Sequence, residues 1–128
     1  MRLPKALIRA ALGVYWAGLF VMTSLPGDSL PSVGAADKLV HFGAYFILGG
    51  IFLLAARTRS GSGIPVRSSV VPVLAVILLY AAFDEWHQDW IPGRDGSIGD
   101  WASDLAGAAA GILAAFWLAG GKLRKSRP

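Results

Sequence analysis

Four long apolar runs constrain the fold of this chain more than any other feature of its sequence. Apolar residues make up 55% of the 128 residues, and the mean hydropathy is +0.55. A soluble core of this size cannot bury so much apolar side chain. Twenty helical residues span about 30 Å, the thickness of the hydrocarbon layer. The sequence therefore predicts an integral membrane protein, whose apolar runs are residues 6–25, 39–56, 70–83 and 105–119.

The third and fourth runs are too short to cross a bilayer by themselves, so their helices must continue into polar sequence. This places Asp84, Glu85 and Asp104 at membrane depth. We predict one all-α domain over residues 1–128, an integral membrane four-helix bundle. Its helices should cover about residues 6–25, 37–56, 69–90 and 101–120.

The charged residues separate onto two sides of the predicted bundle. Ten of the twelve basic residues flank one set of helix ends, and all eight acids fall with both histidines at the other. Because basic residues are enriched in cytoplasmic loops, we predict that both termini are cytoplasmic and that the acids lie outside. The net charge of +4 therefore reflects topology, and we predict no nucleic-acid binding. The ten bases are Arg2, Lys5, Arg9, Arg57, Arg59, Arg67, Lys122, Arg124, Lys125 and Arg127.

Polar residues recur at four-residue steps in three of the four predicted helices, so those of each helix share one face. A charged side chain that faces lipid costs about 3 kcal/mol. We therefore expect the three polar faces to point toward one another and form one site. These faces carry Asp37, His41 and Tyr45; Asp84 and Gln88; and Asp100 and Asp104.

Several residues near this site have simpler structural interpretations. Asp37 can begin a helix as its N-cap or first-turn acid. His41 and Tyr45 can be interfacial residues, and His87 lies out of phase with Asp84 and can be solvated. Trp86, Trp90 and Trp101 are better explained as an aromatic belt than as a binding cage, and Asp89 and Asp95 as loop charges.

The balance of charge leaves open how the site is neutralised. Seven acids from Asp37 to Asp104 face only Lys38 and Arg94, so either some carboxylates are protonated or a cation is bound. Arg94 could hold a phosphate or carboxylate, or it could neutralise a neighbouring acid, which we favour slightly. There is no Cys and no HxxxH or comparable ligand spacing, so we predict no metal and no cofactor.

Small residues are concentrated in the second and fourth helices, where they let helices approach closely. Gly107, Gly111 and Ala115 recur every four residues, and the second helix carries Gly43, Gly49 and Gly50. We favour tight packing within the monomer over a homo-oligomeric interface.

The polar motifs, taken in order, resemble the VanZ-like family over essentially the whole chain. They are Asp37-Lys38-x-x-His41-Phe42-x-x-Tyr45, Asp84-Glu85-x-x-Gln88, Pro92-Gly93-Arg94 and Asp100-x-x-x-Asp104-x-x-Gly107-x-x-x-Gly111. The resemblance implies a small multi-pass protein of the bacterial inner membrane, and the founding member is associated with low-level teicoplanin resistance. It also implies that Asp37, Lys38, His41, Tyr45, Glu85, Gln88, Arg94 and Asp100 occupy the family's motif positions. Asp104 departs from the Asn usual there and adds a negative charge.

Three functions are compatible with these features. We favour a protein that binds or modifies an envelope lipid or lipid-linked cell-wall component, with Lys38 or Arg94 engaging a head-group anion. A more specific form of this hypothesis is an enzyme in which Glu85 or Asp84 is the general base and His41 shuttles the proton. The alternative is proton-coupled export of a small cationic molecule, which requires a site near the middle of the membrane.

Overall fold

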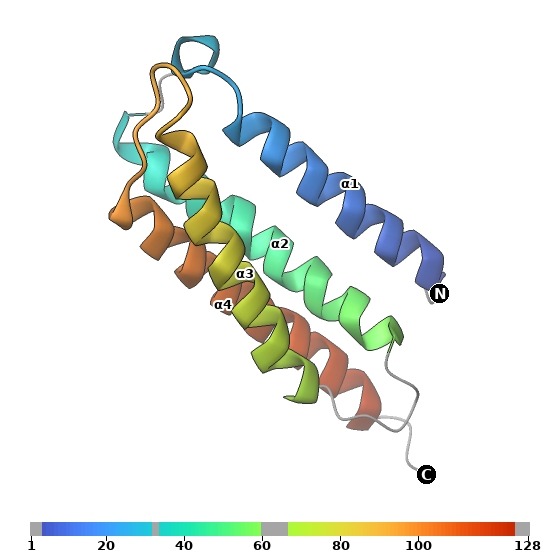
Figure 1. Cartoon of the computed structure of the whole chain (residues 1–128). Coiled ribbons are helices and arrows are strands. Elements are labelled where there is room, and N and C mark those ends of the chain that lie inside the picture. Colours follow the sequence, from blue (N-terminus) through green and yellow to red (C-terminus); the bar gives the residue numbers. More distant parts are fainter. Residues whose placement is uncertain (1–3, 32–33, 60–66, 125–128) are drawn as a thin grey trace.

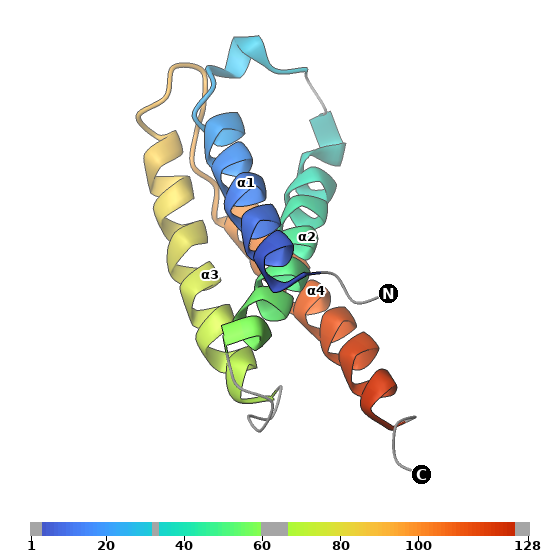
Figure 2. The same ribbon diagram turned by 90° about the vertical axis from the view of Figure 1, so that its right-hand side faces the viewer.

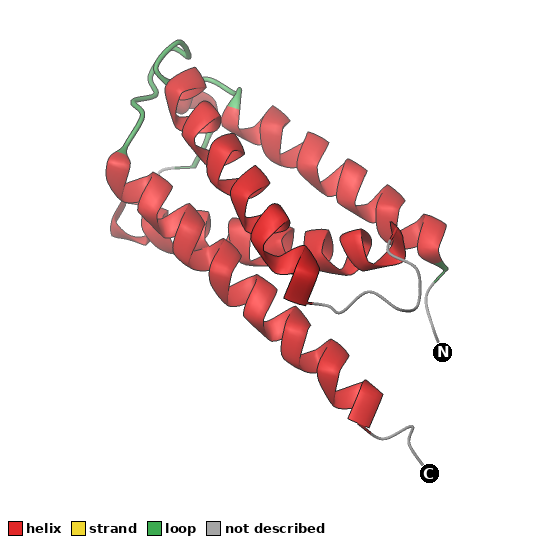
Figure 3. Cartoon of the chain, turned by 60° about the horizontal axis from the view of Figure 1, so that its bottom comes forward, coloured by secondary structure: helices red, strands yellow, loops and turns green. Residues whose placement is uncertain are grey.

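Four α-helices make up most of the computed structural model, which describes residues 4–31, 34–59 and 67–124. Two short 3-10 turns, Gly27–Ser29 and Gly34–Ala36, lie between the first two helices. Each helix is long and apolar enough to cross a membrane. The prediction of an all-α, four-helix membrane protein is thus confirmed (Figure 3). The helices are α1 Lys5–Thr23, α2 Asp37–Arg59, α3 Arg67–Gln88 and α4 Ile98–Arg124.

The helices run alternately up and down (Figures 1 and 2). The α1–α2 and α3–α4 connections lie at one end of the bundle. The start of α1, the end of α2, the start of α3 and the end of α4 lie at the other. Arg9, Arg57 and Arg67 therefore lie at the end opposite the acids. Three of the bases used for the topology prediction lie outside the described residues, namely Arg2, Lys125 and Arg127.

Helix α4 begins at Ile98, before the predicted residue 101, because Ser97 caps its N-terminus. The backbone N–H of Asp100 donates to Ser97 Oγ at 3.3 Å, the usual N-cap contact to the third helical residue. The capped turn adds Ile98 and Gly99 to the helix and fixes where Asp100 lies. Asp37 is the first residue of α2, as expected for a first-turn acid.

Helices α2 and α4 pack closely because glycines remove side chains where they meet. A Cβ on Gly107 would collide with the carbonyl of Phe42, and one on Gly111 with that of Phe46. Gly49 packs in the same way on Ala108. Gly107, Gly111 and Gly49 are thus used inside the monomer, as predicted, whereas a Cβ on Gly43 would meet nothing within 4 Å.

The apolar core lies below the polar end, between α2, α3 and α4. Leu48, Leu53 and Ile77 are completely buried, and Ile112 is 2% exposed. Large apolar side chains also cover the outside of the bundle, including Val71 and Trp117, as expected for helices that face lipid. The core thus supports a layer of polar side chains at its loop end.

Candidate functional site

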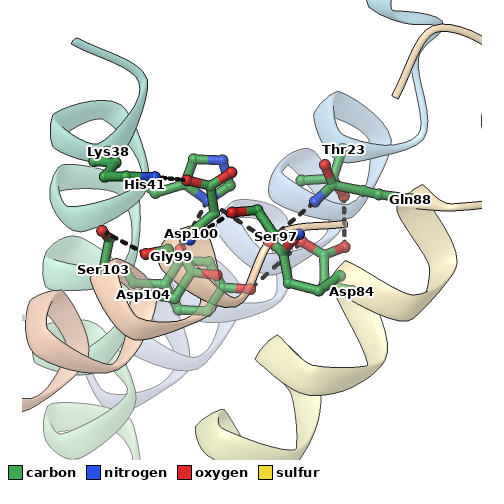
Figure 4. Close-up of polar contacts among 12 residues, drawn as sticks. Thr23, Lys38, His41, Asp84, Gln88, Ser97, Gly99, Asp100, Ser103 and Asp104 are labelled. Carbon is green, nitrogen blue, oxygen red and sulfur yellow. Dashed lines mark hydrogen bonds and ion pairs between the residues drawn. The ribbon is translucent and has the colours of Figure 1, made fainter. Parts of the chain in front are cut away.

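The three predicted polar faces meet at the loop end of the bundle (Figure 4). At most 9% of the residue is exposed at Asp84, Glu85, Gln88, Asp100 and Asp104, although each lies within about two turns of a helix end. Lys38 is exposed, whereas Asp37 and His41 are partly buried. We call this group the polar cluster. It comprises Thr23, Asp37, Lys38, His41, Tyr45, Asp84, Glu85, Gln88, Asp100 and Asp104.

Asp84 joins α3 to α1 and α2. Thr23 Oγ1 donates to Asp84 Oδ1 at 2.7 Å, and the Tyr45 hydroxyl donates to Oδ2 at 3.5 Å. Both oxygens of this fully buried carboxylate thus have hydroxyl partners. The sequence analysis missed Thr23, because a single Thr at the end of an apolar run carries no signal of such a contact.

Glu85 is held by groups from both sides of the α3–α4 connection. The backbone N–H of Ser97 donates to Glu85 Oε2 at 2.7 Å, and Gln88 Nε2 donates to Oε1 at 3.4 Å. His41 Nδ1 lies 3.9 Å from the same Oε1. Ser97 was also missed as a site residue. The signal was the pattern Ser97-Ile98-Gly99-Asp100 before an apolar run, which is typical of a capped helix start.

His41 pairs with Asp104 across the α2–α4 contact, with Nδ1 and Oδ1 2.9 Å apart. The Asp104 side chain is fully buried, and its second oxygen, Oδ2, has no hydrogen-bond partner among the described residues. A buried carboxylate oxygen without a partner is uncommon in a folded protein.

Lys38 and Asp100 form an ion pair at the rim of the polar cluster, 2.9 Å between Nζ and Oδ1. The Lys38 side chain remains 61% exposed, so the ammonium group is accessible from outside.

Arg94 makes no ion pair with an acid in the part of the chain that the structure describes, so the neutralisation favoured from the sequence is not seen as a direct contact. Its Nε donates to the carbonyl of Leu25 at 3.2 Å and its Nη2 to that of Met22 at 2.9 Å. Its Nη1 donates to Gln88 Oε1 at 3.2 Å. The carbonyls of Met22 and Leu25 lie at the C-terminal end of α1, where backbone carbonyls without a helical partner attract cationic groups. Arg94 therefore ties the α3–α4 connection to α1 and orients Gln88 toward Glu85.

A cavity of about 280 Å³ opens beside Glu85. Its walls are mainly apolar and include Ala82, Trp86, Ile98 and Trp101. The volume is close to the lower end of the range for small-molecule sites, about 300–1,000 Å³. Glu85 thus lines this cavity and also contacts Gln88 and His41 of the polar cluster.

The aromatic residues divide between two environments. Trp86 and Trp90 are 57% and 71% exposed and pack edge to face, as expected for a belt. Trp101 is half-buried, and both Trp101 and Trp86 line the cavity. His87 is not solvated as expected, because its ring stacks on Phe20 and Phe83 with centroid distances of 5.3 and 5.9 Å. Asp89 holds the loop by accepting from the N–H of Gly96 at 2.7 Å.

A larger groove of about 730 Å³ lies at the opposite end, between α1, α2 and α3. It is lined mostly by apolar side chains, and its one charged residue, Arg9, donates to the hydroxyl and carbonyl of Thr58. This groove has no group of titratable side chains like that of the polar cluster.

Among the residues that the structure describes, two groups of side chains could offer ligands to a metal ion. One is Asp37, His41 and Asp100, and the other is His41, Glu85 and Asp104. Within each group the candidate ligand atoms lie within 4.8 Å of one another. The spacing along the chain gave no metal signal because each group combines ligands from more than one helix.

Four candidate spans around a buried polar cluster define a multi-pass membrane protein with a polar site at one end of its bundle. The chain belongs to the VanZ/LLP1 family, whose model matches residues 5–119. No curated protein and no solved structure matches it.

Proposed function

We propose that this protein lies in the bacterial inner membrane and binds or modifies an envelope lipid or lipid-linked cell-wall component at the polar cluster. The cavity beside Glu85 carries the proposal, because it joins a buried carboxylate to aromatic and apolar walls. A lipid has the matching combination of an apolar chain and a polar head group.

The charges at the rim suit the head group of such a molecule. The exposed ammonium of Lys38 can contact a phosphate or carboxylate without leaving Asp100. Glu85 lines the cavity and can accept from an amine or hydroxyl. Arg94 is used within the fold, so this proposal assigns the anion to Lys38 alone.

The site also contains the parts of a general acid–base pair. Glu85 can take a proton from a bound hydroxyl, and His41 lies between Glu85 and Asp104, where it can exchange protons with either. A lipid product absent from cells that carry Glu85→Gln would indicate modification. Unchanged lipid composition with retained binding would indicate a binding protein.

Export of a small cation is less well supported. The acids lie toward one end of the bundle: His41 is the fifth residue of α2, and Asp104 is the seventh of α4, about 10 Å from its start. Alternating access needs a central site that opens to both sides.

The proposal is tested by the lipids that remain bound to purified protein. Ala82→Trp should fill the cavity and reduce co-purifying lipid about tenfold by mass spectrometry, whereas Glu85→Gln should change head-group selectivity. Ala75→Trp is the matched control, because it lies two turns earlier on the exposed face of α3 and outside the cavity. Equal lipid content in Ala82→Trp and Ala75→Trp, both folded, would count against this cavity as the lipid site.

Susceptibility to teicoplanin gives a second readout of the same proposal. A sensitive host that expresses the wild-type protein should tolerate more teicoplanin than one with empty vector. The gain should disappear with Glu85→Gln at matched membrane levels. No difference between wild type and empty vector would separate this protein from glycopeptide resistance.

A further inference from the structure

Three potential metal ligands from three helices meet inside the polar cluster. They are His41 of α2, Glu85 of α3 and Asp104 of α4, and their donor atoms lie within 4.8 Å of one another. His41 Nδ1 is 2.9 Å from Asp104 Oδ1 and 3.9 Å from Glu85 Oε1. With bonds of about 2.1 Å, neighbouring ligands of a tetrahedral metal ion lie about 3.4 Å apart, so both distances from His41 Nδ1 are within about 0.5 Å of that spacing.

An unsatisfied oxygen points to a missing partner in this group. Asp104 is fully buried, and its Oδ2 accepts no hydrogen bond from any described residue. The carboxylate is pinned on its other side, where Oδ1 contacts His41. A metal ion would supply the partner that Oδ2 lacks, and it would replace the hydrogen bond between His41 Nδ1 and Oδ1, because a metal-bound ring nitrogen carries no proton.

The charges around the group also favour a cation. Glu85 and Asp104 are both buried, yet neither lies within 4 Å of a Lys or Arg nitrogen among the described residues. Lys38 is paired with Asp100, and Arg94 is bound to carbonyls and Gln88. Buried carboxylates are costly unless paired or bound to a metal, and one divalent ion neutralises two of them.

The neighbouring group of Asp37, His41 and Asp100 lacks both features. The ammonium of Lys38 already sits 2.9 Å from Asp100. Asp37 is only partly buried, and neither acid carries a buried oxygen without a partner. Both groups include His41, so we assign its Nδ1 to the group with Glu85 and Asp104.

We propose that His41, Glu85 and Asp104 bind one divalent transition-metal ion. One imidazole and two carboxylates suit Zn²⁺ or Mn²⁺ better than an ion such as Ca²⁺, which prefers oxygen alone. The Ser97 backbone N–H and the Gln88 amide hold Glu85 from outside, as second-layer contacts of metal ligands do. Three protein ligands leave a position for water or an outside ligand, next to the cavity that Glu85 lines. The metal site does not depend on lipid binding.

The test measures Zn²⁺ binding by full-length protein purified with a histidine-free tag and stripped with a chelator. Calorimetry and elemental analysis should give about one Zn²⁺ per chain. Asp104→Asn keeps the shape of the side chain and should weaken binding at least tenfold, as should Glu85→Gln and His41→Ala. Asp84→Asn is the matched control, because Asp84 is equally buried in the same layer but outside the group. It should bind Zn²⁺ as the wild type does.

Binding of Co²⁺ can be measured on the wild-type protein alone, so this test does not depend on whether a variant folds. Co²⁺ bound by the wild-type protein should produce visible absorption bands that saturate at one ion per chain and vanish when Zn²⁺ is added. Absence of Zn²⁺ and Co²⁺ binding by the wild type would overturn the proposal. So would equal weakening in Asp84→Asn and Asp104→Asn, or loss in Asp37→Asn with full binding by Asp104→Asn.

Discussion

At the scale of single residues, polar side chains in this protein do two kinds of work. Lys38 presents a donor at the rim of the polar cluster, His41 contacts the buried Asp104, and Glu85 presents an acceptor to the cavity. Thr23 and Arg94 instead connect α1 to the rest of the polar end. Residue type alone did not separate these roles, since Arg94 looked like a partner for an acid or an anion and Thr23 like part of an apolar span.

Arg94→Ala should destabilise the protein, because it removes the donors to Met22, Leu25 and Gln88. Hydrogen bonds from charged groups contribute about 1.5–3 kcal/mol each, and water can replace part of this at a partly exposed position, so we expect a loss of about 2–3 kcal/mol. Thermal unfolding in detergent checks this. Asp95→Ala, at the exposed neighbouring position, should leave the melting temperature unchanged. A normal melting temperature with lost lipid binding in Arg94→Ala would instead assign Arg94 to the ligand.

At the scale of helices, the contact between α2 and α4 positions most of the polar cluster. His41 and Lys38 on α2 pair with Asp104 and Asp100 on α4. These short polar contacts are possible because glycines let the two backbones approach on the same side of the helices. The spacing of the small residues therefore determines the geometry of the polar cluster as well as the packing of the helices.

Gly107→Ala should separate α2 from α4, because its Cβ would collide with the carbonyl of Phe42. Overpacking of this kind costs about 1–3 kcal/mol, and the backbone carbonyl has little freedom to move away. Unfolding in detergent should show this loss. Gly43→Ala is the control on α2, where a Cβ meets nothing within 4 Å. Similar melting temperatures for the two variants would mean that the helices are farther apart than described.

At the scale of the whole molecule, the alternation of the helices puts the polar cluster and most described bases at opposite ends. Basic residues are retained on the cytoplasmic side. On this ground we propose that the α1–α2 and α3–α4 connections face outward, with both termini in the cytoplasm.

The absence of Cys makes this orientation easy to test with single-cysteine variants. Ser29 in the α1–α2 connection and Ser68 at the start of α3 are both exposed and lie at opposite ends. In intact cells a membrane-impermeant maleimide should label Ser29→Cys but not Ser68→Cys, which should react only after permeabilisation. The reverse pattern would place the polar cluster on the cytoplasmic side.

The sequence alone determined the class of the protein, its four spans and the polar faces, because span length and helical periodicity are local properties of a chain. It also predicted, from length alone, that Asp84, Glu85 and Asp104 belong to the spans, and the candidate spans Arg67–Gln88 and Ile98–Ala119 contain them. Only the tertiary structure decided which groups pair: Thr23 with Asp84, Ser97 with Glu85, and Arg94 with the end of α1. Such contacts join residues of different helices or loops, so they depend on how the helices pack, which no local pattern encodes.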